Sequence, residues 1–444
     1  MIGKTLEQNS PQKVFELQSS HQWTVRRSSS SERIKKLKRL KASIQSHEVE
    51  VKSALHSDLR QVELAESAIA GCYGDIDDAI ENLEGWMAPV DVQSSGAVPG
   101  TRAKIIYEAR GIILLFSAWN FPFNLIFQPL VPIIAAGNCA IVKPNSMAPK
   151  TSAIAVKIIR EAFNEKEIAV FEGSVELSNQ LLAMPIDHIF FTGSPAVGKI
   201  ILSAAAKHLA TVTLELGGKN PVIIDKQADI QDAATKIAMF RNMNNGQVCL
   251  CPENVWVHAN CKDQFIEATK TAYEQLLYTE GELNIESAGK IVNQRNLDRI
   301  KGYVEDATQK GAKIAYGGEI LNETQSMHPT VLVDVPADAD INFEEVFGPI
   351  LSVFTYNDIS EVYAELNKQS KPLSLYIFST NDAFVSDVLI NTSSGGVTVN
   401  NCMLHFMEHN LPFGGVGGSG TGRYHSVHGF KELSHERSVL YTDV

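Results

Sequence analysis

The chain has 444 residues, of which 44% are apolar and 20% are charged, and its formal net charge is −12. This length is too great for one ordinary core, so we expect two or three domains, and the composition excludes a long disordered tail. The acidic balance leaves no excess of lysine and arginine for a phosphate backbone, which argues against nucleic acid as a partner.

The cysteines and the apolar runs indicate the compartment. The six cysteines are sparse and lack CxxC spacing, so we expect neither a disulfide framework nor a metal site, and a reducing, cytoplasmic location is favoured. The N-terminus lacks the apolar segment of a secretion signal, and Ile2 replaces the glycine needed for myristoylation. The longest apolar stretches, 111–119 and 130–142, are too short to span a bilayer, so we expect no membrane anchor.

The first predicted element is a helix that begins near Ser29. Ser29 stands three residues before Glu32, the spacing of a capping box, and leucine and isoleucine then recur at helical intervals. From Gly111 onward, short apolar runs alternate with helical patterns: GIILLFSAW, NCAIVKP, EIAVFEG, HIFFTG, VTLELGG and PVIID. Continuous runs of β-branched and aliphatic residues are typical of strands buried on both faces. This series therefore predicts a parallel sheet with crossover helices.

A second series of strands follows an amphipathic stretch over 230–243. Its runs are VWVH, TVLVDV, GPILSVFTY, LSLYIFS and GGVTVNN, again interleaved with helical segments such as 265–277. We therefore expect two α/β domains, with a junction near Gly217–Gly218 and no flexible linker between them. Two domains packed this closely leave a cleft for ligands.

Three side chains in these runs are candidate catalytic groups. Asn120 follows the strand GIILLF, where its amide can donate to a developing oxyanion, and Glu215 ends an apolar strand, where it is a candidate general base. Cys249, in NNGQVCLCP, follows a predicted helix and is a candidate nucleophile. Taken singly, each has a plain alternative: turn chemistry for Asn120, a surface carboxylate for Glu215 and a small buried hydrophobe for Cys249.

The segment FTGSPAVGK predicts a strand, a glycine-bearing turn and a helix, an arrangement that suits a pyrophosphate at a helix N-terminus. It is nearly a P-loop, but Ile200 occupies the position at which a serine or threonine binds magnesium. The segment also lacks the GxGxxG pattern, so spacing alone leaves the type of nucleotide open.

Taken together, these segments resemble the aldehyde dehydrogenase superfamily, specifically its class 3 branch, from about Glu32 to the C-terminus. The chain also carries AAAKHLATVTLELGGKNP, FEEVFGPI, KPLSLYIFS and LPFGGVGGSGTGRYH, in the family's order and at its approximate spacing. The resemblance implies NAD(P)-dependent oxidation of medium-chain aliphatic or aromatic aldehydes to carboxylates. It makes Cys249 the nucleophile that forms a thiohemiacetal and then a thioester, Asn120 the oxyanion donor and Glu215 the base for hydrolysis.

The resemblance also implies NAD or NADP as cofactor and gives a set of cofactor-binding positions. These are Trp119, Lys143, Ser146, Gly193, Ser194, Gly198, Glu345 and Phe347. Ser146 stands where relatives selective for NAD tend to carry a glutamate, so we expect the enzyme to accept NADP.

The family fold implies two Rossmann-like α/β domains and a small bridging arm that pairs subunits into a homodimer. The expected boundaries are 1–85 and 105–216 for the NAD(P)-binding domain, 217–400 for the catalytic domain, 86–104 and 428–444 for the arm, and 401–427 for a return segment to the cofactor domain. Within the arm we expect strands near Trp86–Lys104 and Arg437–Thr442.

Three other functions compete with this interpretation. In a CoA-acylating dehydrogenase, CoA rather than water resolves the thioester, but Glu215 argues against it because acylating relatives typically lack that base. A P-loop NTPase is disfavoured by Ile200, and a catalytically silent relative by the intact Cys249, Glu215 and Asn120 set. Four further side chains are expected either to line an apolar entrance for the aldehyde or to belong to the core: Phe121, Phe123, His405 and Phe406.

Overall fold

The computed structural model describes residues 9–60 and 62–442, so the outermost parts of the first and last domain assignments, 1–8 and 443–444, lie outside the described residues. The described chain opens with the helices α1 (Pro11–Arg26), α2 (Ser30–Ser46), α3 (Glu48–Leu59) and α4 (Val62–Met87). The predicted capping box at α2 is confirmed, because Ser29 Oγ accepts the Glu32 N–H at 3.3 Å and the Glu32 carboxylate accepts the Ser29 N–H at 2.7 Å. The apolar face of α2 is buried in the core.

The first predicted strand series forms a six-stranded sheet in the order β19-β7-β6-β3-β4-β5. Its parallel strands are β3 (Ile112–Phe116), β4 (Cys139–Lys143), β5 (Ile168–Val170), β6 (His188–Thr192) and β7 (Thr211–Glu215). The connecting helices are α5 (Asn124–Ala136), α6 (Pro149–Ala162), α7 (Val175–Leu182) and α8 (Pro195–Ala205). Strands β3 to β6 are buried on both faces, as the continuous apolar runs predict.

The five runs of the second series lie in a seven-stranded sheet in the order β12-β15-β16-β9-β8-β17-β18. Its edge strand β12, which no apolar run predicted, pairs antiparallel with β15. Its strands are β8 (Pro221–Ile224), β9 (Asn254–His258), β12 (Lys313–Tyr316), β15 (Thr330–Val333), β16 (Ile350–Tyr356), β17 (Ser374–Phe378) and β18 (Gly396–Val399). Helices α9 (Ile230–Asn242), α10 (Lys262–Leu277), α12 (Gln294–Lys310), α13 (Ile359–Leu366) and α14 (Asp382–Asn391) accompany them.

One strand was grouped wrongly by the sequence pattern. The run PVIID follows the first series directly, but as β8 it pairs with β9 and β17 in the second sheet. The chain passes from the first sheet to the second between Glu215 and Pro221, the stretch that contains the junction expected near Gly217–Gly218, so the grouping of apolar runs and the expected junction disagree about this strand. The smaller elements of the second half are β10 (Tyr278–Thr279), β11 (Glu282–Leu283), α11 (Ile285–Ala288), β13 (Ile320–Leu321) and β14 (Ser326–Met327).

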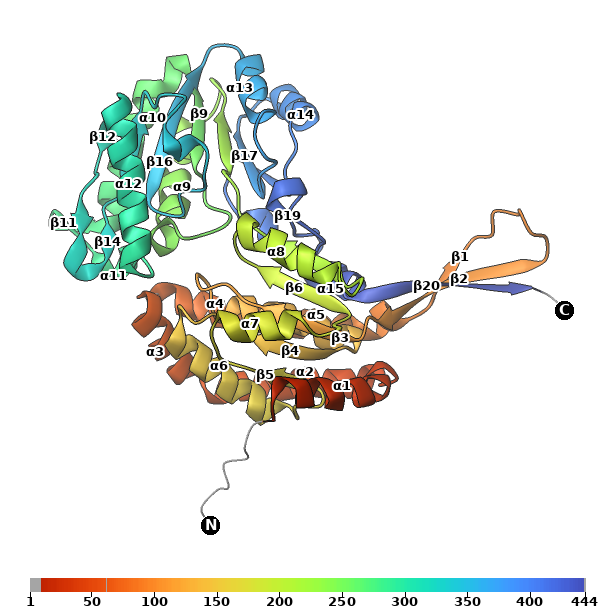
Figure 1. Cartoon of the computed structure of the whole chain (residues 1–444). Coiled ribbons are helices and arrows are strands. Elements are labelled where there is room, and N and C mark those ends of the chain that lie inside the picture. The colour runs from red at the N-terminus through yellow and green to blue at the C-terminus, as the bar shows by residue number, and fades with distance from the viewer. Residues whose placement is uncertain (1–8, 61, 443–444) are drawn as a thin grey trace.

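A three-stranded antiparallel sheet extends away from the body of the molecule (Figure 1). It consists of β1 (Val90–Val92), β2 (Thr101–Ala109) and β20 (Ser434–Thr442). Strands β2 and β20 pair along their whole length, so both reach further toward the body than the strands expected in the arm. Two α/β sheets with a small antiparallel sheet confirm the expected fold class.

The chain returns to the first sheet near its end. Strand β19 (Gly420–Thr421) pairs antiparallel with β7, placing Gly420 opposite Glu215, and α15 (Ser426–Glu432) then leads into β20. The C-terminal part of the chain therefore covers the strand that carries Glu215. Within the described residues, no helix has the length and apolar character needed to cross a membrane.

Candidate active site

Cys249 lies in a loop with an unusual backbone. After α9, the turn Met243–Gly246 places Asn244, Asn245 and Gly246 in the left-handed region, with φ of 52°, 50° and 75°. A Cβ on Gly246 would overlap the backbone of Gly348, so only glycine allows this close approach. The loop that carries Cys249 is thereby packed against the loop that follows Phe347.

Asn120 lies beside this loop. Its Nδ2 donates to the Gln247 carbonyl at 3.1 Å, and its own carbonyl accepts from Asn244 Nδ2 at 2.9 Å. Asn220 holds the same loop from another side, because its Nδ2 donates to the carbonyl of Cys249 at 2.8 Å. The sequence interpretation missed Gln247, Asn244 and Asn220. Only the Asn-Asn-Gly run carries a signal, because asparagine and glycine tolerate left-handed backbone.

The charges nearest Cys249 are carboxylates. Its side chain is half-buried, and burial raises the pKa of the thiol above its usual range, with the charges of Glu345 and Glu215 adding to the rise. The neighbouring Cys251 turns away, since its thiol donates to the carbonyls of Phe240 at 3.2 Å and Arg241 at 3.4 Å. A disulfide between the two cysteines is therefore disfavoured by the geometry.

Glu215 ends β7, as predicted, and is 4% exposed. Neither of its carboxylate oxygens has a hydrogen-bond partner among the described residues. Burial raises the pKa of this carboxyl well above its usual range, Arg423 opposes that rise and Glu432 adds to it. A buried carboxyl without a partner is costly to a fold, so its presence at a strand end indicates a functional group.

Glu345 contacts the segment Gly217–Gly218, which connects the two sheets. The backbone N–H of Gly218 donates to its carboxylate, and a Cβ on Gly217 would overlap that carboxylate. Burial raises the pKa of Glu345 to about 8. Two residues on, Phe347 packs edge-to-face against Trp119, with the ring centroids 5.4 Å apart. The structure therefore brings Trp119, Glu345 and Phe347 to the same boundary between the sheets.

A buried ion pair that the sequence interpretation missed fixes the Glu345 loop. Lys219 pairs with Glu253 and donates to the carbonyl of Glu344 at 3.0 Å, while the Glu253 carboxylate accepts the Val346 N–H at 3.1 Å. Lys219 and Glu253 are spaced too far apart in the sequence for any local pattern to indicate the pair.

The phosphate turn has the predicted strand, turn and helix. Ser194 caps α8, accepting the Val197 N–H at 3.5 Å, and the Gly193 N–H donates to the Glu215 carbonyl at 3.0 Å. Gly198 is buried, and a Cβ there would lie 3.1 Å from Leu216. The start of α8 is thus exposed at Ser194 and lies next to the strand that carries Glu215.

Lys143 ends strand β4, and Ser146 lies in the turn that follows it. Lys143 is buried, its Nζ donates to the Pro144 carbonyl at 3.2 Å, and burial lowers the pKa of its ammonium group. Ser146 is exposed in the turn that follows. Because β3, β4 and β6 are parallel, Trp119, Lys143 and Gly193 lie at or after carboxyl ends at one edge of the sheet, where ligands bind in folds of this kind.

Two of the four residues proposed for an apolar entrance belong to the core. Phe123 is fully buried and packs on Phe127, with ring centroids 4.6 Å apart. His405 is buried and bonded to Ser374 at 3.2 Å and to Thr398 at 2.8 Å. For metals, the described residues contain no group of three or more histidine, cysteine or acidic side chains able to hold an ion.

Comparison with known proteins identifies the family to which this chain is similar. Residues 9–439 match the family model described as Aldehyde dehydrogenase family. The chain is 44% identical to the protein AldX of Bacillus subtilis (strain 168), covering 97% of each chain. It is 37% identical to aldehyde dehydrogenase family 3 member A2 of Pongo abelii, covering 92% of this chain and 83% of that one.

Two further relatives extend the comparison. The chain is 36% identical to the dimeric NADP-preferring aldehyde dehydrogenase of Canis lupus familiaris, covering 92% of this chain and 89% of that one. Among solved structures, the substrate-bound state of Staphylococcus aureus AldH matches with a TM-score of 0.94 at 34% identity, covering 98% of this chain and 95% of that one.

Proposed function

The chain belongs to the aldehyde dehydrogenase family and is similar to its class 3 members, and we propose that it oxidises medium-chain aliphatic or aromatic aldehydes to carboxylates through a thioester on Cys249. As a family member it is an NAD(P)-dependent oxidoreductase that acts on aldehydes. One observation carries the finer proposal. A thiol, an amide held beside its loop, and a buried carboxyl without a partner occur together at the boundary of the two sheets.

In the proposed first half-reaction, the thiol of Cys249 gives its proton to a neighbouring carboxylate, the sulfur attacks the aldehyde carbon, and the electron pair of the C=O π bond moves to the oxygen, which becomes an oxyanion. Asn120, oriented by its bond to the Gln247 carbonyl, stabilises that oxyanion together with the backbone N–H of Cys249. When bound, NAD(P) supplies the hydride acceptor for this oxidation. The product on Cys249 is then a thioester.

Glu215 serves the second half-reaction. Its carboxylate takes a proton from water, the water oxygen attacks the thioester carbon, and the carboxylic acid leaves as the thiol of Cys249 forms again. The two unpartnered oxygens of Glu215 support this role, because a base that is already hydrogen-bonded is a weaker proton acceptor. The presence of this base favours water over CoA as the acyl acceptor.

The residues at the edge of the first sheet fit a dinucleotide. The exposed start of α8 offers backbone N–H groups to phosphates beside Gly193 and Ser194. In the same sheet, Lys143 ends β4 and Ser146 lies in the turn that follows. Trp119, Glu345 and Phe347 lie where the first sheet meets the second, nearest to Cys249. We assign phosphate binding to Gly193 and Ser194, with Trp119 on the phosphate side and Gly198 packing the helix. Lys143 and Ser146 are assigned to the adenosine ribose, and Glu345 and Phe347 to the nicotinamide ribose and ring.

The arm supports a homodimer. Its small sheet exposes Val90, Val92 and Leu440, which a second subunit would cover, and one similar protein is described as dimeric. The domain boundaries given above remain our proposal.

Six free cysteines among the described residues are consistent with a reducing cytoplasm.

Single-turnover kinetics with two variants test the mechanism. Cys249→Ala should abolish formation of reduced cofactor while cofactor binding survives, whereas the matched control Cys251→Ala should stay active because the Cys251 thiol contacts α9. Glu215→Gln should keep one burst of reduced cofactor and lose steady turnover. Turnover by Cys249→Ala within about tenfold of the parent would contradict the assignment. Restoration of Glu215→Gln turnover by CoA alone would favour an acylating enzyme.

A further inference from the structure

One face of β7 carries a row of polar side chains. Thr211, Thr213 and Glu215 share that face, because side chains two apart in a strand point the same way. Arg110 Nη1 donates to Thr211 Oγ1 at 3.2 Å, and Thr213 Oγ1 donates to the Glu432 carboxylate at 2.9 Å. Residues near the C-terminus therefore bring charge to the same face that holds Glu215.

Arg423 brings a positive charge to this face. Its Nη1 donates to the carbonyls of Gly415 and Gly422 at 2.6 Å each, which fixes the guanidinium. The Cδ of Arg423 and Oε1 of Glu215 each lie 3.1 Å from the point that a Cβ on Gly414 would occupy. Gly414 therefore lies between the two side chains, and the carbonyl oxygen of Gly422 lies close to the same point.

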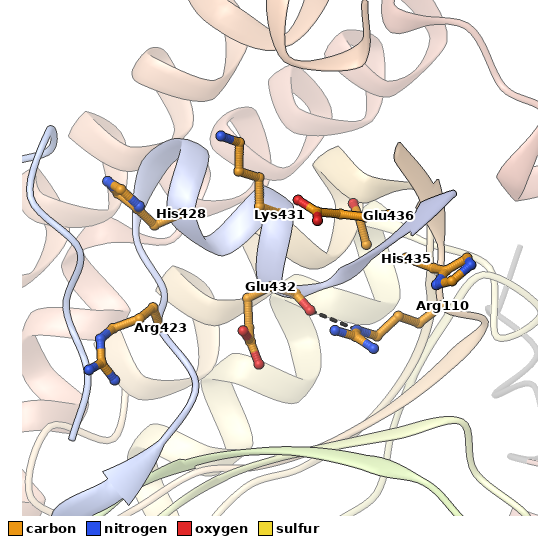
Figure 2. Close-up of a pocket in the computed structure, with 8 residues that line it drawn as sticks. Arg110, Arg423, His428, Lys431, Glu432, His435 and Glu436 are labelled. Atoms are coloured by element: carbon orange, nitrogen blue, oxygen red, sulfur yellow. Dashed lines mark hydrogen bonds between the residues drawn. The ribbon is translucent and has the colours of Figure 1, made fainter. Parts of the chain in front are cut away.

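Arg423 and Glu432 also line a cavity of about 380 Å³ on the side of the return segment, together with Arg110 and His428 (Figure 2). Figure 2 shows the Glu432 side chain between those of Arg423 and Arg110. None of the proposed catalytic residues lines this cavity. The two opposite charges thus line a cavity to which the proposed catalytic residues do not contribute.

We propose that Arg423 and Glu432 are positioning residues that control whether Glu215 is ionised: Arg423 favours the carboxylate and Glu432 favours the acid. The proposal rests on the function above, in which Glu215 is the base. Both oxygens of Glu215 are buried and without partners, so neighbouring charges act on it with little screening. The charge of Arg423 lowers the pKa of Glu215 and the charge of Glu432 raises it, which are the directions that the proposal requires.

The other titratable groups that face Glu215 are the Cys249 thiol and the Tyr424 phenol. Burial raises the pKa of the Tyr424 phenol, which favours its uncharged form, and in the acyl-enzyme Cys249 is an uncharged thioester, so neither group reverses the effect of Arg423. A base must be ionised to accept a proton, so thioester hydrolysis should rise with pH through the pKa of Glu215 and then level off.

Three variants test the proposal through the pH dependence of thioester hydrolysis after a single acylation. Arg423→Gln should move the profile to higher pH by roughly one unit, the lower end of the shift that an opposite charge nearby produces. Glu432→Gln, which keeps an oxygen for Thr213, should move it to lower pH. Arg423→Lys keeps the charge and should leave the profile close to that of the parent.

Infrared titration gives a readout independent of activity. The band of the protonated carboxyl that disappears in Glu215→Gln is followed against pH in the parent and in each variant. Shifts of opposite sign for Arg423→Gln and Glu432→Gln support the proposal, and equal or absent shifts overturn it. If Glu215→Gln leaves hydrolysis intact, the proposed base is wrong, while the infrared shifts still decide whether Arg423 and Glu432 control its charge.

Discussion

At the residue scale, the thiol of Cys249 is surrounded by groups that oppose its ionisation. Burial raises the pKa of this thiol first, and Glu345 and Glu215 raise it further. Oxidation of cysteine follows thiolate character, so the groups that raise this pKa also oppose oxidation of the proposed nucleophile. The thiolate must then be favoured by ligands that enter the site or by transfer of its proton to a neighbouring carboxylate.

Ser146 gives a prediction about cofactor choice. An added carboxylate about 4 Å from the extra phosphate of NADP would repel it by roughly 1–4 kcal/mol at effective dielectrics of ~80 to ~20. Ser146 is exposed and lies three residues after Lys143, so it can take a glutamate without disturbing the core. We expect the parent to accept NADP at least as well as NAD, and Ser146→Glu to shift the ratio of kcat/KM values toward NAD by about tenfold or more.

Steady-state kinetics with both cofactors check this. Ser386→Glu, at an exposed serine of α14, is the matched control and should leave the ratio unchanged. A parent that strongly prefers NAD, or a Ser146→Glu variant with an unchanged ratio, would show that Ser146 does not contact the cofactor.

At the scale of elements, Gln247 fixes the loop that carries the nucleophile. This buried side chain donates to the carbonyls of Asn244 at 2.9 Å and Lys290 at 2.8 Å, and accepts the Val292 N–H at 2.9 Å. Gln247→Leu would leave these groups unsatisfied at roughly 1–3 kcal/mol for each buried one. We expect the free energy of unfolding to fall by about 3 kcal/mol and the acylation burst to slow, because Asn120 is bonded to the same loop.

Denaturant unfolding and burst kinetics measure the two effects. Gln231→Leu, at an exposed glutamine of α9, should change stability by less than about 0.5 kcal/mol and leave the burst intact. Equal behaviour of the two variants would mean that the loop is held without Gln247.

The elements also show what could be predicted from the sequence. Most strands of both large sheets follow from continuous apolar runs, because burial on both faces removes polar positions. Strand β12, at the edge of the second sheet, was not predicted because it is partly exposed and lacks such a run. Strand β19 is only two residues long and glycine-bearing, so nothing local indicates that it pairs with β7. The sheet to which β8 belongs likewise depends on long-range pairing.

The residues of the candidate site likewise fall into those that the sequence indicates and those that depend on long-range contacts. Cys249, Glu215 and Asn120 could be singled out because nucleophilic or polar groups at strand ends and glycine-bearing loops are chemically distinctive. Asn220 and Arg423 could not, because their roles depend on which backbone carbonyls the fold places opposite them. His405 was ambiguous for the same reason, since its partners come from two strands of the second sheet.

At the scale of the whole molecule, the exposed arm leads us to expect that two subunits associate through it. The sheet of β1, β2 and β20 extends from the body and exposes Leu440, which is 57% exposed (Figure 1). A small sheet with apolar residues in solvent is unfavourable unless another surface covers it. Leu440→Asp should weaken the homodimer at least about tenfold, because a charge would be buried at the interface.

Sedimentation over a range of concentrations measures this change. Val49→Asp, at an exposed apolar residue of α3, is the control and should sediment like the parent. A Leu440→Asp protein that stays dimeric at low concentration would place the interface elsewhere.

The pairing of β7 has a consequence for synthesis on the ribosome. One neighbour of β7, the strand β6, is made just before it, whereas the other, β19, emerges almost last. During most of translation the strand that ends in Glu215 is therefore an open edge, and open edges invite pairing with other chains. Any nascent fragment that stalls before Gly420 exposes this edge, so quality control by chaperones and proteases should act most strongly on incomplete chains of this enzyme.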